Sequence, residues 1–208
     1  MKQYGATPIK DVAGYLPRDK VVELVNASSG NIRDFVLLST LALTGRRVSE
    51  IVGLRYRTGE DGNEVRLEEP LGGLRPMDLL EGDTAAFMIL KRKAPTRKVK
   101  PIPAKLTKLL KEYIAYKNIK PEALIFPISR QRVDQIIKKY ARLIGIRSVG
   151  NRKMGAHVFR HSYAISLIDK LNIGMLQELL GHASIDTTAH YLQYSTKDVG
   201  DKLEEALG

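Results

Sequence analysis

The side chains of this 208-residue chain that could together do chemistry are two arginines, two histidines and a tyrosine. They are Arg47, His157, Arg160, His182 and Tyr191. Two guanidinium groups suit the oxygens of a phosphate, because each is always charged and can donate two parallel hydrogen bonds. A tyrosine hydroxyl can act as a nucleophile. The set therefore predicts cleavage of a phosphodiester without a metal ion, since fixed positive charge stabilises the transition state.

Taken singly, each of these residues also has an ordinary structural explanation. The spacing His157-x-x-Arg160 places both side chains on one helix face, which often happens by chance. His182 follows a glycine that can end a helix, and Tyr191 could be a half-buried aromatic residue with Tyr194 as a competitor. Only the combination of these residues favours a catalytic site.

Other chemistries fit the sequence less well. His157 and His161 have the spacing of zinc ligands on a helix, but the segment lacks the glutamate of an H-E-x-x-H motif, and Arg160 would repel the metal. The chain has no cysteine, which excludes a thiol nucleophile, a disulfide framework and a cysteine zinc site. The glycine-rich motifs G-x-x-x-x-G-K-[ST] and G-x-G-x-x-G, which bind nucleotide phosphates, do not occur, so we expect no nucleotide cofactor. The acidic residues are scattered, so we expect no metal site either.

The charge of the chain indicates a polyanionic partner. Lys and Arg number 34 against 23 Asp and Glu, which gives a net charge of +11 and a pI near 9.8. Nucleic acid is the first candidate for such a protein. The apolar fraction of 43% is ordinary for a globular protein and excludes a disordered chain. The longest uncharged apolar run, residues 35–44, is too short to span a membrane, so no membrane association is expected.

The first part of the chain has a helical pattern that then fails. Pro17 and the apolar residues after it predict a short helix that ends near Gly30. Asn31 can cap a second helix that Gly45 can close, and residues 47–54 predict a third. Residues 57–75 are rich in glycine, proline and acidic side chains, which predicts an exposed insertion.

The remainder of the chain predicts one small sheet and several helices. Residues 85–90 and 99–102 can pair as antiparallel strands across a basic turn. Helices are expected over residues 104–117, after Ser129, from near Ala156, between Asn172 and Gly181, after Ser184 and at the end of the chain. The expected fold is therefore mainly α, with a small antiparallel β-sheet.

In their order along the chain, these motifs resemble those of the tyrosine recombinase family, which includes phage integrases and Xer-like recombinases. The matching segments are Thr44-Gly45-Arg46-Arg47-Val48-Ser49-Glu50, His157-x-x-Arg160-His161, Leu179-Leu180-Gly181-His182 and Tyr191. The resemblance covers about residues 16–195 and implies the catalytic-domain fold of that family. It implies an active-site set of Arg47, Lys93, His157, Arg160, His182 and Tyr191, with Lys91 as the alternative to Lys93.

The resemblance also implies a role for each of these side chains. Tyr191 would attack phosphorus, form a 3′-phosphotyrosyl bond and release a 5′-hydroxyl. The two arginines and His182 would bind the scissile phosphate. Lys93 would protonate the departing oxygen, and His157 would help to manage the tyrosine proton.

Further basic residues are expected to contact the DNA backbone. They lie on the predicted hairpin and in the basic loop before Ala156, and each would release counterions on binding. These residues are Lys91, Arg92, Arg97, Lys98, Lys100, Arg152 and Lys153.

The chain is expected to be one catalytic domain over residues 1–208. Residues 1–15 would be an N-terminal extension, 57–75 an insertion, and 197–208 a helix that packs on its own core or on a neighbouring subunit. Most family members carry an N-terminal core-binding domain as well, and none is expected within this sequence. The alternatives are a naturally short family member and a fragment of a longer protein.

The function implied by the resemblance is site-specific recombination of duplex DNA without metal, ATP or another cofactor. A monomer in free solution would assemble as a tetramer on two DNA sites, in the cytoplasm with the nucleoid. Two alternatives remain open, a DNA-relaxing enzyme of topoisomerase type and a non-catalytic basic DNA-binding module.

Overall fold

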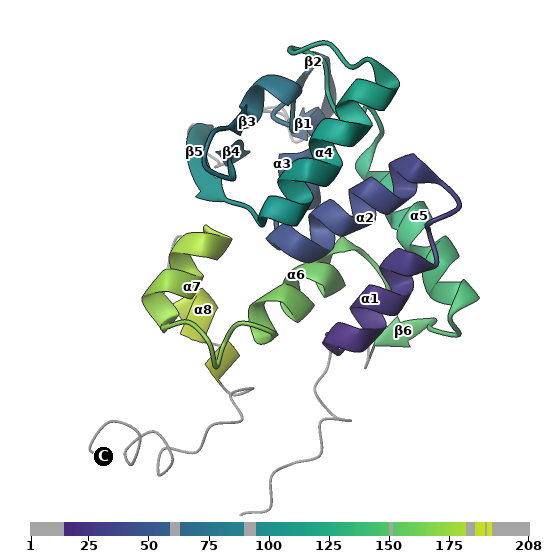
Figure 1. Ribbon diagram of the computed structural model, residues 1–208, viewed down its shortest axis with the longest axis vertical. Helices are drawn as coiled ribbons and strands as arrows, with labels where there is room; N and C mark the ends of the chain where they lie inside the picture. The colour runs from purple at the N-terminus through teal and green to yellow at the C-terminus, as the bar shows by residue number, and fades with distance from the viewer. Residues whose placement is uncertain are drawn as a thin grey trace, which may run out of the picture.

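The computed structural model describes residues 15–58, 63–89, 95–149, 152–181, 186–189 and 191–192. Its helices are α1 (Arg18–Asn26), α2 (Ile32–Thr44), α3 (Val48–Val52), α4 (Ala104–Lys117), α5 (Arg130–Leu143), α6 (Ala156–Ile165), α7 (Ile173–Leu180) and α8 (Asp186–Ala189), with a 3₁₀ turn η2 (Pro76–Asp78) (Figure 1). Its strands are β1 (Leu54–Thr58), β2 (Glu64–Leu71), β3 (Leu79–Leu80), β4 (Thr84–Ile89), β5 (Thr96–Pro101), β6 (Ser148–Val149) and β7 (Arg152–Lys153). Among the described residues, no helix is both long and apolar enough to cross a membrane.

The helix ends lie where the sequence predicts them, because local side chains complete their hydrogen bonding. Asn31, Ser129 and Asn172 each accept a backbone N–H from the first turn of α2, α5 and α7. Gly45 and Gly181 follow α2 and α7 with left-handed backbone, at φ values of 58° and 70°. The expected cap at Ser184 and the expected helix after residue 197 lie outside the described residues.

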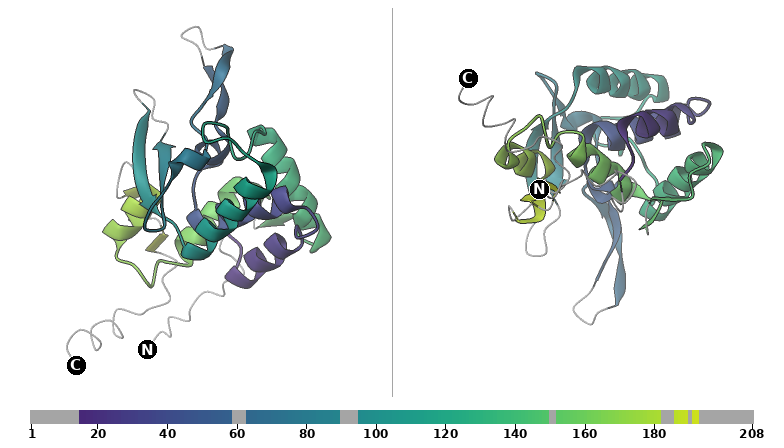
Figure 2. Two further views of the ribbon diagram at one scale, coloured as in Figure 1. Left: turned by 45° about the horizontal axis from the view of Figure 1, so that its top comes forward. Right: turned by 90° about the horizontal axis from the view of Figure 1, so that it is seen from below.

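The mainly α fold is confirmed, but the described strands form three small sheets instead of one. The predicted hairpin is present as β4 and β5, and β3 extends it to a three-stranded antiparallel sheet of order β3-β4-β5. The expected insertion, residues 57–75, contains the end of β1 and all of β2, and these two strands pair as a separate antiparallel hairpin. This hairpin projects from the helical body (Figure 2).

The core divides into a large cluster and a small one. The large cluster centres on α2, whose Val36, Leu37, Leu38 and Leu41 are fully buried against α4 and α6. The small cluster joins the end of α6 to α7 and comprises Ala164, Ile168, Leu176, Leu180 and Tyr191. The packing of this small cluster fixes residue 191 beside α6.

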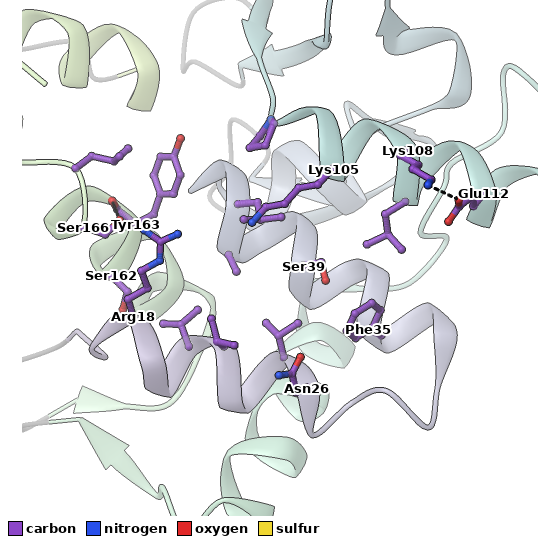
Figure 3. A pocket seen from close by; sticks show the side chains of 18 residues that line it. Arg18, Asn26, Phe35, Ser39, Lys105, Lys108, Glu112, Ser162, Tyr163 and Ser166 are labelled. Carbon is purple, nitrogen blue, oxygen red and sulfur yellow. Dashed lines mark hydrogen bonds and ion pairs between the residues drawn. The ribbon is translucent and has the colours of Figure 1, made fainter. Parts of the chain in front are cut away.

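A hollow of about 700 Å³ lies between α1, α2, α4 and α6 (Figure 3). Its walls are mainly aliphatic, and Arg18, Lys105 and Lys108 lie among its lining residues. Helix α6 contributes Ser162 and Tyr163 to this hollow, and the turn that follows the helix contributes Ser166 and Leu167. Of the expected active-site residues, the four that the structure describes (Arg47, His157, Arg160 and Tyr191) do not line it, so the expected site has to be sought elsewhere on α6.

Candidate active site

Arg160 on α6 joins three of the motif segments. Its Nη1 donates to the carbonyl of Gly45 at 2.8 Å, and its Nη2 donates to the carbonyl of Leu180 at 2.8 Å. These acceptors lie at the C-terminal ends of α2 and α7, where carbonyls lack partners within the helix and the helix dipole is negative. One guanidinium group therefore brings together the segments that precede Arg47 and His182.

The environment of Arg160 is strongly positive. The residue is only 6% exposed. This burial, together with repulsion from Arg47 and Arg46, lowers the pKa of the guanidinium to about 10, whereas the charge of Glu50 opposes the shift. Arg160 therefore stays charged at neutral pH although no carboxylate in the described part of the chain forms an ion pair with it, and the two helix ends stabilise that charge.

Arg47 is held at the start of α3 by the carboxylate of Glu50. The Arg47 backbone N–H donates to Glu50 Oε2 at 3.2 Å, and Nη1 donates to Oε1 at 3.2 Å. The side chain of Glu50 is only 1% exposed, whereas that of Arg47 is 42% exposed. A buried carboxylate thus orients a guanidinium that remains accessible to a ligand.

Arg46 adds a third guanidinium beside the other two. It is buried, with Nη1 3.8 Å from Glu50 Oε2 and its guanidinium carbon 5.2 Å from the centre of the Phe87 ring. Within the described residues, neither of its Nη atoms has a hydrogen-bond partner. The cluster formed by Arg46, Arg47, Arg160 and Glu50 therefore has a net positive charge, which suits the binding of a phosphate.

We expect the substitution Arg46→Met to stabilise the fold by about 1 kcal/mol. Methionine fills a similar volume and removes two buried donors that lack a hydrogen bond, each of which costs about 1–3 kcal/mol. The lost contact with Phe87, which contributes about 0.5–2 kcal/mol, and the lost attraction to the Glu50 carboxylate offset part of this gain. Urea unfolding of the two proteins measures the difference. Arg46→Lys keeps the charge and should show no gain, and a loss above about 1 kcal/mol for methionine would contradict the prediction.

Tyr191 is docked in its own chain, against α6. It is 4% exposed, and its hydroxyl lies 2.9 Å from Nδ1 of His161. The two rings meet edge to face, with their centres 5.6 Å apart and an angle of 60° between their planes. The tyrosine hydroxyl therefore reaches α6 one residue beyond Arg160.

Lys100 connects the β4–β5 hairpin to α7, which differs from the surface position expected for a DNA contact. The residue is 4% exposed, and its Nζ donates to the Glu178 carbonyl at 2.7 Å and to Oε1 at 3.3 Å. Lys98 on the same strand is exposed, and Arg97 forms an ion pair with Asp78. Lys100 thus anchors the base of the hairpin whose tip would carry Lys93.

The structure brings four of the six expected active-site residues to one region around α6. Arg47, Arg160 and Tyr191 are placed as described above, and His157 is exposed on the first turn of the helix. Other expected residues lie outside the described part of the chain, namely His182, Lys91, Arg92 and Lys93. The side chain of Arg152 also lies outside the described part of the chain. Lys153 is described and is exposed.

His161, like Arg46 and Glu50, belongs to this region although the sequence did not assign it to the active site. It is half-buried and contacts the hydroxyl of Tyr191. Its spacing from His157 places both histidines on one face of α6, and the sequence showed this spacing only as a possible zinc pair. His161 and Tyr191 lie far apart in sequence, so no local sequence pattern predicts their contact.

The comparisons with known proteins agree with this geometry. The model of the phage integrase family matches residues 15–198. A tyrosine recombinase of Pseudothermotoga lettingae is 28% identical over 201 residues, which cover 94% of this chain and 62% of that protein. The chain thus spans less than two thirds of the length of this relative.

Solved structures show the same fold. The catalytic domain of bacteriophage HP1 integrase superimposes with a TM-score of 0.61 at 17% identity, covering 92% of this chain and 94% of that one. The XerH site-specific recombinase bound to difH substrate gives a TM-score of 0.64 at 23% identity, covering 93% of this chain and 52% of that one.

The family match includes every motif segment that Arg160 joins, and it extends over nearly all of the described residues. The fold agrees with an integrase catalytic domain along almost the whole length of both chains. On these grounds, the chain belongs to the phage integrase family.

Proposed function

We propose that this chain carries the strand-cleaving activity of a site-specific DNA recombinase, with Tyr191 as its nucleophile. The observation that carries the proposal is the position of Arg160, which joins the Arg47 and His182 segments and lies on the helix that docks Tyr191. The name of the Pseudothermotoga relative supports the same activity. The net charge of +11 favours DNA as the substrate.

The proposed reaction needs neither metal nor ATP. Arg47, Arg160 and His182 bind the phosphate, and Tyr191 gives its hydroxyl proton to a histidine of α6 as its oxygen attacks phosphorus. The bond from phosphorus to the 5′ oxygen breaks, and this oxygen takes a proton from Lys93. The 3′-phosphotyrosyl bond conserves the bond energy, so that a second 5′-hydroxyl can reverse the step and join new strands.

Two further aspects of the function are proposed from the family resemblance. The free chain is a monomer that assembles as a tetramer on two DNA sites, and it acts in the cytoplasm on nucleoid DNA. Light scattering of the protein with and without a duplex measures the assembly, and a free tetramer or a complex that stays monomeric would contradict it.

The experiment that tests the cleavage proposal is covalent trapping on nicked duplexes. The duplexes are taken from the genetic neighbourhood of the gene, and each is radiolabelled at the 5′ end of the strand to be cut. A nick just 3′ of the scissile phosphate lets the short 5′-hydroxyl product diffuse away, so the adduct accumulates. Denaturation in detergent should leave a labelled protein band. Tight binding without a band on any duplex would favour a non-catalytic DNA-binding module.

Lys98 and Lys100 should affect DNA binding differently although they lie on one strand. Lys98→Ala removes an exposed cation, so the slope of log affinity against log salt should flatten by about 0.9 for one lost phosphate contact. Lys100→Ala should leave this slope unchanged and lower the melting temperature, because Glu178 loses its buried donor. Fluorescence anisotropy over a salt series measures both slopes, and equal flattening in the two variants would contradict the assignment of Lys100.

A further inference from the structure

We propose that His161 is a catalytic residue that accepts the proton of the Tyr191 hydroxyl as the tyrosine attacks DNA. The inference rests on the proposed function, and it assigns a role to a histidine that the sequence motif left without one. The observation behind it is the distance of 2.9 Å between the tyrosine hydroxyl and Nδ1 of His161.

The contact meets the geometric requirement for a general base. Such a base must lie within about 2.6–3.2 Å of the atom whose proton it removes. A neutral imidazole accepts at Nδ1 when its hydrogen is on Nε2, and this is the tautomer that the proposal requires. The edge-to-face packing of the rings and the burial of Tyr191 in the α6–α7 cluster hold this arrangement.

The other histidine on this face of α6 does not make the same contact. His157 lies one turn earlier and is exposed, and among the described residues it has no hydrogen bond to Tyr191. Its place at the start of the helix, before Arg160, suits a contact with the phosphate. The assignment of the tyrosine proton therefore moves from His157 to His161.

The neighbouring cations favour the transfer. Tyr191 is close enough to Arg160 to interact with its charge, so the developing tyrosinate lies beside a buried guanidinium. A neutral imidazole has a free lone pair at Nδ1 that can take the proton. His161 is also partly exposed, which lets it pass that proton on to solvent.

The step balances in atoms and charge. The O–H bond of Tyr191 breaks, and its proton goes to Nδ1 of His161, which becomes an imidazolium. The tyrosine oxygen forms a bond to phosphorus while the bond to the 5′ oxygen breaks. That oxygen leaves with the electron pair and takes a proton from Lys93, and nothing is oxidised or reduced.

Two substitutions at residue 161 separate a base from a hydrogen-bond acceptor. His161→Asn places an amide oxygen or nitrogen where Nδ1 lies, so the variant can hold the tyrosine but cannot take its proton. His161→Ala removes both abilities. We expect both variants to slow the formation of the adduct on nicked duplex by about 10²- to 10⁴-fold, with an unchanged Kd for the duplex. Circular dichroism melts of both variants check that they are folded.

A second substrate shows which end of the reaction His161 serves. Sulfur in place of the 5′ bridging oxygen leaves as a thiolate, which needs no proton donor because its pKa is far below that of an alkoxide. The deficits of His161→Asn and His161→Ala should persist on this substrate, whereas Lys93→Ala is the control that it should rescue. Rescue of the His161 variants would overturn the assignment.

The remaining outcomes are also decisive. Normal cleavage by His161→Asn with slow cleavage by His161→Ala would show that only the hydrogen bond matters, and it would overturn the role as a base. Faster cleavage by either variant would show that His161 restrains the tyrosine, which overturns it as well. If the wild-type chain forms no adduct on any duplex, the proposed function itself fails, and this failure is seen before any variant is compared.

Discussion

Replacing Tyr191 by phenylalanine should abolish the covalent protein–DNA adduct and leave the affinity for the duplex almost unchanged. The substitution removes only the hydroxyl that would attack phosphorus, while the ring still packs in the cluster with Leu176 and Leu180. The loss of the bond to His161 should lower the free energy of unfolding by only about 1 kcal/mol. The labelled band in a detergent gel, the Kd and the melting temperature of both proteins measure these effects.

Tyr194→Phe is the matched control, because it removes the same atom from the competing tyrosine. We expect this variant to form the adduct at the wild-type rate. An adduct that persists in Tyr191→Phe and disappears in Tyr194→Phe would move the nucleophile to residue 194. Loss of the band in both variants would require each hydroxyl for the reaction and would contradict the assignment of a single tyrosine.

Replacing Arg160 by alanine should slow cleavage by at least about 10³-fold, since one donor to a developing negative charge contributes about 10²–10³ and this donor also positions other segments. The carbonyls of Gly45 and Leu180 lose their donors, while the penalty for burying a charge disappears as well. These effects oppose each other, so we expect a net destabilisation of about 2 kcal/mol. Single-turnover cleavage and urea unfolding measure the two quantities.

Arg160→Lys separates the charge of this residue from its shape. Lysine keeps the positive charge but has a single nitrogen, which cannot span two carbonyls and a phosphate as a planar guanidinium can. We therefore expect the lysine variant to lose most of the activity as well. Cleavage within about tenfold of the wild-type rate would show that charge alone is sufficient, and it would contradict the joining role of Arg160.

Local signals explain why much of the helical framework could be predicted. Asn31, Ser129 and Asn172 act on the turns that follow them, and Gly45 and Gly181 act on the turns before them. None of these effects depends on distant parts of the chain. The predicted helix over residues 104–117 agrees with α4 because its apolar side chains recur at helical spacing, which is also a local signal.

The β1–β2 hairpin and the strand β5 show where local reasoning was insufficient. Strand β2 carries several charged residues and packs little of its length against the core, so it lacks the alternation of a half-buried strand. In β5, hydropathy would bury Val99 and expose Lys100, but Val99 is exposed and Lys100 is buried. Glu178 explains why Lys100 is buried, because its carbonyl and its carboxylate accept hydrogen bonds from the ammonium group of Lys100.

The candidate site was predictable in its residue types but not in its connections. The motif spacings identified Arg47, His157, Arg160 and Tyr191, which the structure places in one region. The partners of Arg160 are main-chain carbonyls, and every amino acid has one, so no residue type indicates them. The contact of His161 depends on how α6 and α7 pack, which local patterns do not encode.

The bonds of Arg160 to the main chain have a consequence for how this site can be lost by mutation. No substitution at residue 45 or 180 removes the acceptor itself, because the carbonyl belongs to the backbone. A side chain at residue 45 would instead act indirectly, since its Cβ would clash with the ring of Tyr163 at a backbone φ of 58°. A genetic screen for inactive variants should therefore recover changes of Arg160 itself. Its two partners would be visible only through changes that displace the end of a helix, such as a side chain at residue 45, an insertion, a deletion or a proline.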